Sequence, residues 1–307
     1  MFTLRRLVGL KTLWVLFALI LLVGTCLLAF SYYSKPTENN EVNVCLHLSD
    51  YDNETVSHLR DLKISWVRTD WLVTADNSMT IYSQTLQDNS INLLAIIDTN
   101  TFNNQNFTLK QWNTTITEIV NSEGFNNTDA VEIWNEPNGA ENTYPEAYIQ
   151  PEKYYEMLKS AYAIIKNYTV VEVVFAGISP NIPDWQTYLN TVFAYGDTQN
   201  YFDYMGIHFY DDVTTNLDTL EFVKGLTNKP IWLTETGKPS VNNDQAAQAT
   251  YVRSIYSNFG SLVSKIFIYE LKDNYGLFPE NENHFGLLTI DGTKKESYNV
   301  VWDINRK

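Results

Sequence analysis

Short apolar segments alternate with amphipathic stretches along most of the chain, and this alternation is the feature that most restricts its fold. Eight segments rich in β-branched and aromatic residues are typical of strands buried on both faces: 42–48, 64–68, 91–97, 130–134, 170–176, 204–208, 231–234 and 266–270. Intervals with helical character lie between them at 54–62, 109–120, 151–168, 185–194 and 244–264. Strands alternating with helices predict a parallel sheet, and the number of strands predicts its closure. We expect the α/β class, with a single (β/α)8 (TIM) barrel over residues 42–307.

The N-terminal segment has a different pattern. Residues 12–34 carry no charge and follow Arg5, Arg6 and Lys11. A bilayer requires about 20 apolar residues, so this stretch is long enough to cross one, and its basic end is expected inside the cell. We expect 1–34 to be an uncleaved transmembrane helix and 35–41 a short stalk. A cleaved signal segment is the alternative, and it leads to the same exterior location in secreted form.

Exposure to the cell exterior has a second source of support. Five asparagines begin Asn-x-Thr sequons, the acceptor pattern for N-glycosylation: Asn53, Asn106, Asn113, Asn126 and Asn167. Together with the anchor, these sequons predict a single-pass membrane glycoprotein whose folded part lies outside the cell.

Charge and composition exclude several partners. The net charge of −15 and the pI of about 4.6 argue against nucleic acid, which is itself a polyanion. The four histidines and two cysteines show no spacing typical of metal ligands, so we expect neither a metal nor another cofactor. The oligomeric state stays open.

Two glutamates follow apolar strand patterns in matching contexts. Glu136 comes directly after the strand at 130–134 and Asn135, and Glu235 comes directly after the strand at 231–234. The carboxyl ends of barrel strands are where active sites are built. A single glutamate there could simply cap a helix. Two in matching contexts predict a catalytic pair.

Three motifs resemble glycoside hydrolases of clan A, and family 39 with its relatives in particular. They are the Trp-Asn-Glu-Pro-Asn run at 134–138, the Ile-His-Phe-Tyr run at 207–210 and the Thr-Glu-Thr-Gly run at 234–237. The segments at 285–288 and 291–295 are similar to the region after the last strand of such enzymes. The resemblance covers nearly all of the chain beyond the stalk.

This resemblance implies an activity and roles for residues. Glu136 corresponds to the acid/base and Glu235 to the nucleophile of a retaining glycosidase, whose carboxyl groups lie about 5–5.5 Å apart. Asn135 is expected to bind the sugar 2-hydroxyl, and Arg68 is expected beside the nucleophile. An asparagine in a turn and a surface salt bridge are the simpler alternatives for these two.

Other candidates for carbohydrate binding follow the strands. His208 and Tyr210 share one side of an extended chain, so both are expected to face the pocket. Glu270 could bind a sugar hydroxyl or pair with Lys272. Trp71, Trp185 and Phe285 could stack on sugars or lie in the core, and His47 could be a ligand or a core histidine. The clan often has tryptophan where this chain has Tyr269, which changes the expected floor of the sugar site.

Two functions are compatible with these patterns. The first is a glycosidase that hydrolyses O-glycosyl bonds of β-linked oligo- or polysaccharide. The second is a non-catalytic barrel that binds glycans or serves as surface structure. The intact motifs favour the enzyme.

Overall fold

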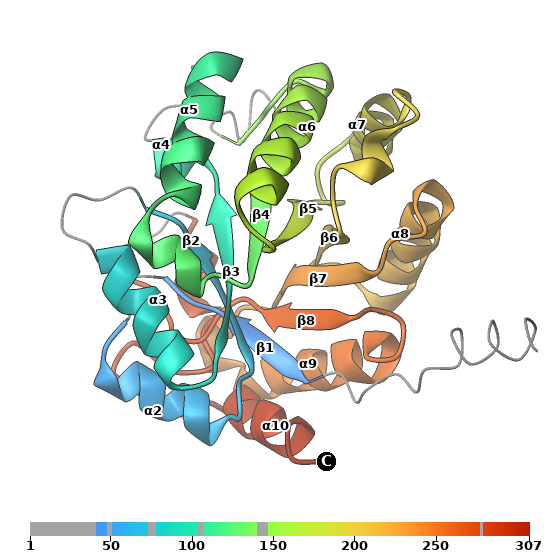
Figure 1. The fold of residues 1–307 in the computed structure, drawn as a ribbon. Coiled ribbons are helices and arrows are strands. Elements are labelled where there is room, and N and C mark those ends of the chain that lie inside the picture. The colour runs from blue at the N-terminus through green and yellow to red at the C-terminus, as the bar shows by residue number, and fades with distance from the viewer. Residues whose placement is uncertain (1–40, 48–50, 73–77, 103–106, 140–146, 277–278) are drawn as a thin grey trace, which may run out of the picture. The chain divides into compact units, whose positions relative to one another are not determined.

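Eight parallel strands close into one barrel in chain order, from β1 to β8 (Figure 1). The computed structural model describes residues 41–47, 51–72, 78–102, 107–139, 147–276 and 279–307. The strands are β1 (Val42–Cys45), β2 (Trp66–Asp70), β3 (Asn92–Ile97), β4 (Ala130–Asn135), β5 (Glu172–Ile178), β6 (Tyr204–Phe209), β7 (Ile231–Thr236) and β8 (Lys265–Ile268). The predicted (β/α)8 barrel is therefore confirmed.

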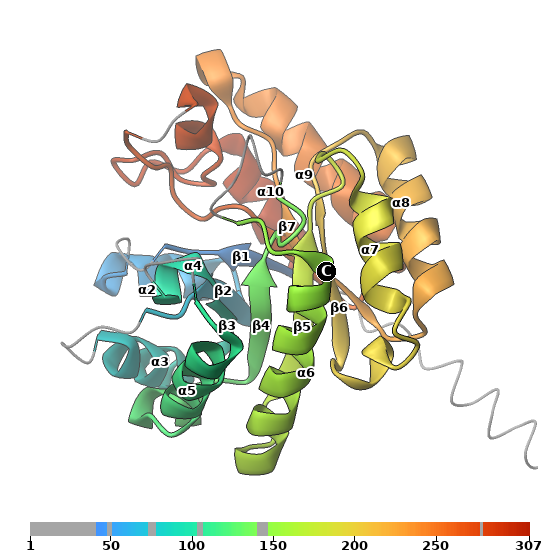
Figure 2. The same ribbon diagram turned by 90° about the horizontal axis from the view of Figure 1, so that it is seen from above.

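Helices surround the strands, as Figure 2 shows from above. They are α2 (Asn53–Asp61), α3 (Ser78–Asp88), α4 (Thr99–Phe102), α5 (Leu109–Val120), α6 (Pro151–Tyr168), α7 (Trp185–Phe193), α8 (Val213–Leu226), α9 (Gln245–Phe259) and α10 (Glu296–Ile304). Short 3₁₀ turns are η2 (Glu123–Asn127), η3 (Thr198–Asn200), η4 (Val241–Asn243) and η5 (Glu280–His284).

Local sequence signals set where several helices begin. The Asp52 carboxylate accepts the Thr55 N–H at 2.7 Å and starts α2. Thr108 and Gln111 form a reciprocal capping box at the start of α5. Pro151 occupies the first turn of α6, where its missing N–H costs nothing.

All eight strands differ from their predicted ranges at one or both ends, by up to three residues, and two differences are notable. The helix expected over 244–264 ends at Phe259, because the chain turns at Gly260 and re-enters the barrel at Lys265. The strand expected to end at Thr234 runs on to Thr236, so that Glu235 lies inside β7.

The barrel interior is filled by a small apolar layer, separate from the larger core between strands and helices. Its buried members are Cys45, Leu94, Ala130, Val174, Trp232 and Phe267. The Trp232 ring contacts Trp66 and stacks on Tyr204, and the Lys265 ammonium lies 4.3 Å from the centre of the Trp66 ring. This layer closes one end of the barrel.

Alternation along the strands brings polar side chains to the other end. Arg68 lies two residues beyond Trp66 on β2, and Glu132 lies two residues beyond Ala130 on β4. Side chains two residues apart share a face of a strand. The polar layer therefore sits above the apolar one, toward the carboxyl ends of the strands.

The expected membrane anchor, residues 1–34, lies outside the described residues. Of the expected stalk, residues 35–41, only Glu41 is described. Within the part of the chain that the structure describes, no helix is both long and apolar enough to span a bilayer.

Candidate active site

Glu136 follows β4 at a tight bend of the backbone. Its φ of 45° and the φ of 74° at Trp134 lie in the left-handed region, which side-chain-bearing residues seldom occupy. The Trp134 indole N–H donates to the Ala147 carbonyl at 2.7 Å, and the Glu136 N–H donates to the Gly177 carbonyl at 3.0 Å. These bonds fix the bend, and the Glu136 carboxylate reaches His208 of β6.

Glu235 is positioned by an irregularity between two strands. The register of β6 and β7 shifts between Ile207 and His208, so that His208 pairs with Glu235. Such a bulge re-aims a side chain. The buried Glu235 carboxylate accepts Arg68 Nη1 at 2.6 Å and the Tyr210 hydroxyl at 2.7 Å.

His208 lies between the two carboxylates. Its Nδ1 is 2.7 Å from Glu136 Oε1 and 3.6 Å from Glu235 Oε2. One oxygen of each carboxylate and a ring nitrogen of His208 all lie within 4.8 Å of one another. This spacing resembles the roughly 5–5.5 Å of retaining glycosidases rather than the roughly 6.5–9.5 Å of inverting ones.

Arg68 joins four side chains from β1, β4 and β7. Besides Glu235, its guanidinium donates from Nη2 to Asn135 Oδ1 at 2.9 Å and from Nε to Glu132 Oε2 at 2.6 Å. Its Nη1 also lies 3.9 Å from Cys45 Sγ. The guanidinium is buried, so it needs these acceptors and cannot turn away from them without losing hydrogen bonds.

Glu132 is a member of the site that the sequence alone did not reveal. Its side chain is 0% exposed, and its second oxygen, Oε1, accepts the Gly177 N–H of β5 at 2.7 Å. A glutamate in the middle of an apolar strand is rare unless it is paired. That position, four residues before Glu136, was the signal that could have identified it.

The charges around Glu235 set its protonation. Burial alone would raise the pKa of this carboxyl, but the charges of His208 and Arg68 and the Tyr210 hydroxyl outweigh it and lower the pKa. Burial disfavours the charged form of His208, yet the nearby Glu235 charge and the bond to Glu136 raise its pKa. The site therefore favours an ionised Glu235.

Gly177 provides the space that the His208 ring occupies. A Cβ at this position would lie 1.9 Å from His208 Nε2. Real side chains do not tolerate such an approach, so β5 must have glycine where the imidazole passes. The sequence patterns do not identify this glycine, because its role depends on a neighbouring strand.

The remaining predicted candidates divide between rim and core. Glu270 is buried at the rim, where its carboxylate lies 3.0 Å from His47 Nε2 and accepts Asn274 Nδ2 at 2.6 Å. Trp71 is 3% exposed and packs edge-on against Phe125, which fits the core alternative better than sugar stacking.

The other two aromatic candidates also pack against neighbours. Trp185, the first residue of α7, contacts Phe222 of α8 edge-on. Phe285 is buried beside Tyr210 and Tyr269, with ring centres 5.9 and 5.5 Å away. Phe285 therefore supports the tyrosine that donates to Glu235.

Two aspartates at the rim also went unpredicted. Asp70 ends β2 and Asp98 follows β3, and Asn100 holds both: its side chain donates to Asp70 Oδ2 at 3.0 Å and its backbone N–H to Asp98 Oδ1 at 2.8 Å. Burial, and then the neighbouring charge of Asp70, raises the pKa of Asp98 to about 7.

The trio of Glu136, His208 and Glu235 also has the donor types of a metal site. Their close spacing could accommodate an ion. However, the Arg68 guanidinium lies 2.6 Å from Glu235, and its positive charge disfavours a divalent cation beside it. The trio is better explained by hydrogen bonds among its own members.

Comparison with known proteins identifies the family and the fold. The family described as glycosyl hydrolase catalytic core matches residues 47–271. No curated protein matches the chain. A family 39 glycoside hydrolase from the gut symbiont Bacteroides cellulosilyticus WH2 shares the fold with a TM-score of 0.67 and 19% identity, over 87% of this chain and 64% of that chain. This chain thus spans less than two thirds of that protein.

Two further solved structures are similar in fold. A GH5_18 protein from Streptomyces cattleya has a TM-score of 0.63 and 16% identity, over 88% of this chain and 80% of that chain. The family 1 β-glucosidase from Thermotoga maritima has a TM-score of 0.66 and 11% identity, over 88% of this chain and 98% of that chain. The predicted resemblance to clan A is confirmed. The chain therefore belongs to the glycosyl hydrolase catalytic core family and shares its barrel fold with these clan A enzymes.

Proposed function

We propose that this chain is a glycosidase that cleaves β-linked oligo- or polysaccharide with retention of anomeric configuration, using Glu136 and Glu235. The observation that supports this proposal most strongly is the close pair of carboxylates, of which only Glu235 is bonded to Arg68. Two carboxylates in different environments can take different roles in one reaction.

In the first step, ionised Glu235 attacks the anomeric carbon. Glu136 donates its proton to the leaving oxygen as the glycosidic bond breaks, and a glycosyl ester forms on Glu235. In the second step, Glu136 takes a proton from water, whose oxygen attacks the anomeric carbon. The ester bond then breaks and restores both carboxyl groups. His208 bonds Glu136 throughout, and Arg68 and Tyr210 hold the leaving carboxylate of Glu235.

Substrate binding follows from the same geometry. Asn135 is held by Arg68 beside Glu136, which supports its proposed contact with the sugar 2-hydroxyl. Glu270 is buried and pairs with the partly exposed His47 at the rim of β8 and β1, so it would position His47 toward sugar hydroxyls.

We also propose that residues 1–34 anchor the enzyme and that the barrel works outside the cell. The charge-free stretch over 12–34 and the sequons support this location. Expression of the full chain in a host cell tests it: the enzyme should sediment with membranes and be digested by protease added to intact cells. A chain starting at Glu41 should be found in the soluble fraction. Full-length enzyme in the cytosol would contradict the proposal.

Hydrolysis by the chain starting at Glu41 tests the reaction. Solved structures of similar fold include a β-glucosidase, fungal β-1,4-galactanases and a β-galacturonidase, so a panel of neutral and acidic β-linked glycans and aryl β-glycosides is appropriate. Glu235→Gln should abolish turnover of every substrate. Glu136→Gln should lose about 10²–10⁴-fold on poor leaving groups and far less on dinitrophenyl glycosides, which need no general acid.

The control is Glu172→Gln, the same change at a half-exposed carboxylate near the opposite end of the barrel. It should retain wild-type rates. If both active-site variants stayed active, the assignment of the pair would be wrong. If the wild type bound glycans of the panel but cleaved none, and binding survived both changes, the non-catalytic glycan-binding barrel would be favoured.

A further inference from the structure

A hollow of about 470 Å³ lies among the segments that follow β7 and β8. Its lining includes Asn243, Asn274, Tyr275, Asn283 and Lys295. Segments that follow strands lie on the face of the barrel that carries the active site. The volume is within the range of about 300–1,000 Å³ found for ligand sites. The proposed two-glutamate mechanism does not use this hollow.

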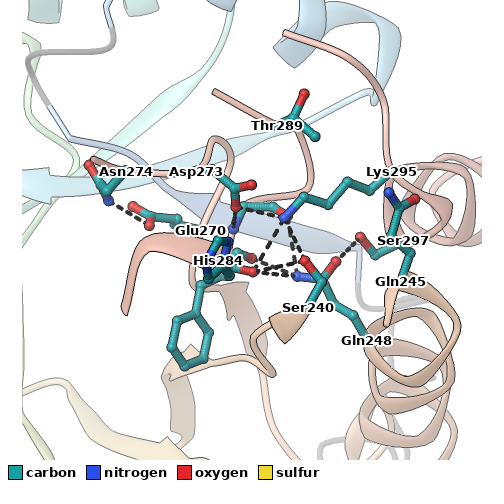
Figure 3. Close-up of polar contacts among 12 residues, drawn as sticks. Ser240, Gln245, Gln248, Glu270, Asp273, Asn274, His284, Thr289, Lys295 and Ser297 are labelled. Atoms are coloured by element: carbon teal, nitrogen blue, oxygen red, sulfur yellow. Dashed lines mark hydrogen bonds and ion pairs between the residues drawn. The ribbon is translucent and has the colours of Figure 1, made fainter. Parts of the chain in front are cut away.

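One wall of the hollow is fixed by a buried lysine (Figure 3). Lys295 Nζ donates to Asp273 Oδ1 at 2.6 Å, to Ser240 Oγ at 2.9 Å and to the His284 carbonyl at 3.3 Å. The other contact of Asp273 Oδ1 is the Gly286 N–H at 2.8 Å. These bonds tie together the segments after β7, after β8 and before α10.

The same wall is anchored from α9. Gln248 Nε2 donates to the carbonyls of Phe285 at 2.9 Å and Gly286 at 3.2 Å, and Gln248 Oε1 accepts the Ser297 hydroxyl at 2.7 Å (Figure 3). Each of these groups is buried and bonded, which restrains the backbone of 284–286. The hollow is therefore pre-formed on this side, as binding sites commonly are.

The lining suits a neutral, hydroxylated ligand. The three protons of the Lys295 ammonium already have acceptors in Asp273, Ser240 and His284, so this lysine is not available to an anion. The Tyr275 side chain is 89% exposed and lines the hollow. An open ring beside the exposed Asn243 side chain offers a stacking face and a hydrogen-bonding group, the two contacts that a sugar ring makes.

Contacts through intermediate residues connect the walls of the hollow to the rim of the barrel and to the proposed catalytic centre. Asn274 lines the hollow and donates to Glu270, which lies 3.0 Å from His47 at the rim (Figure 3). Asn283 of η5 lines the hollow, while Phe285, which follows η5, packs against Tyr210.

We propose that this hollow binds a neutral sugar residue of the glycan, at a distance from the bond that is cleaved. The inference rests on the proposed function for the identity of the glycan. It assigns to Tyr275 and Asn243 a role in selecting longer chains over single glycosides.

Kinetics on long and short substrates test the site. Tyr275→Ala and Asn243→Ala change exposed side chains and should leave the fold intact. Because removing an aromatic ring that stacks on a sugar costs roughly a factor of ten in affinity, kcat/KM should fall about tenfold further for the polysaccharide than for an aryl monosaccharide. Tyr168→Ala removes another exposed tyrosine, at the far end of α6, and should behave as wild type on both.

Binding measured without turnover separates this inference from the catalytic one. Hexasaccharides of β-glucan, β-1,4-galactan and xylan are titrated into Glu235→Gln protein, with and without Tyr275→Ala, and followed by NMR. Binding that weakens with Tyr275→Ala supports the hollow even if hydrolysis is never observed. The proposed sugar site would be wrong if kcat/KM fell equally on short and long substrates. It would also be wrong if no hexasaccharide bound, or if binding were unchanged by Tyr275→Ala.

Discussion

Arg68 helps to lower the pKa of Glu235, and Glu132 holds the Arg68 guanidinium in place. We predict that Glu132→Gln lowers both stability and activity. A carboxamide offers one oxygen where the Arg68 Nε–H and the Gly177 N–H each need an acceptor, and its NH₂ group faces one of these donors. Breaking a buried ion pair costs about 3–5 kcal/mol of unfolding free energy, which urea denaturation measures.

The pH profile distinguishes positioning from simple destabilisation. Arg68 lowers the pKa of Glu235, and the proposed mechanism requires Glu235 to be ionised. If Glu132→Gln loosens Arg68, the pKa of Glu235 rises and the acidic limb of kcat/KM moves to higher pH. The Glu172→Gln control should change the unfolding free energy by less than about 1 kcal/mol and leave the limb in place. An unmoved limb in Glu132→Gln would contradict the positioning role.

Site residues could be predicted where they end or follow an apolar pattern in the sequence. A site residue inside such a pattern could not be predicted. Glu136, Glu235, Asn135, Arg68, His208 and Tyr210 follow or end strand patterns in the sequence, and the structure brings them together. Glu132 reads as part of an apolar strand, and its partners come from β2 and β5, which are distant in sequence. Trp71 carried no sequence signal to separate core from rim, since both are common for an aromatic residue.

At the scale of elements, the close approach of β5 and β6 decides where His208 lies. We predict that Gly177→Ala displaces the imidazole from Glu136, because the new Cβ would lie 1.9 Å from Nε2. Overpacking of this kind costs about 1–3 kcal/mol, and kcat should fall as well. Thermal unfolding and kcat on an aryl glycoside measure the two effects.

A second glycine provides the matched control. Gly225 lies in α8, and a Cβ there would meet nothing within 4 Å. Because alanine favours a helix over glycine by up to about 1 kcal/mol, Gly225→Ala should be slightly more stable and fully active. If Gly177→Ala behaved like Gly225→Ala, the proposed steric role of β5 would be wrong.

The order of elements could be predicted from sequence, whereas their registers could not. Alternating apolar and helical patterns placed Glu136 after the fourth strand and Glu235 at the seventh. The shifts between β6 and β7 and between β7 and β8 depend on which residues pair across strands, and one sequence contains no local sign of that. This is also why Glu235 was expected just after its strand rather than within it.

The stability of the whole molecule depends on pH through Asp98, because burial of this carboxyl lowers the free energy of unfolding at neutral pH. Asp98 has an ordinary pKa of 3.8 when unfolded and about 7 when folded, chiefly because of burial. The folded state thus holds the proton more tightly. The resulting penalty is absent below about pH 4, grows as the pH rises to 7, and is complete above it.

We predict that Asp98→Asn raises the melting temperature at pH 8 and has little effect at pH 4, because an amide oxygen can still accept the Asn100 N–H. Asp212, the N-cap of α8, is a control of opposite sign. The pKa of Asp212 is lowered, chiefly by the hydrogen bond from the Thr215 N–H. Its contribution to the free energy of unfolding is therefore present at pH 8 and lost in acid. A gain for Asp98→Asn that was larger at pH 4 than at pH 8 would refute the account.

Capture of the glycosyl-enzyme shows whether Glu235 is the nucleophile. Activated 2-fluoro glycosides with dinitrophenyl leaving groups slow both steps but allow the first, so the ester accumulates if the mechanism is retaining. Peptide mass spectrometry should locate one fluorosugar on Glu235 in the wild type and none in Glu235→Gln. An adduct on Glu136, or turnover with inverted anomeric configuration and no adduct at all, would contradict the assignment of Glu235 as the nucleophile.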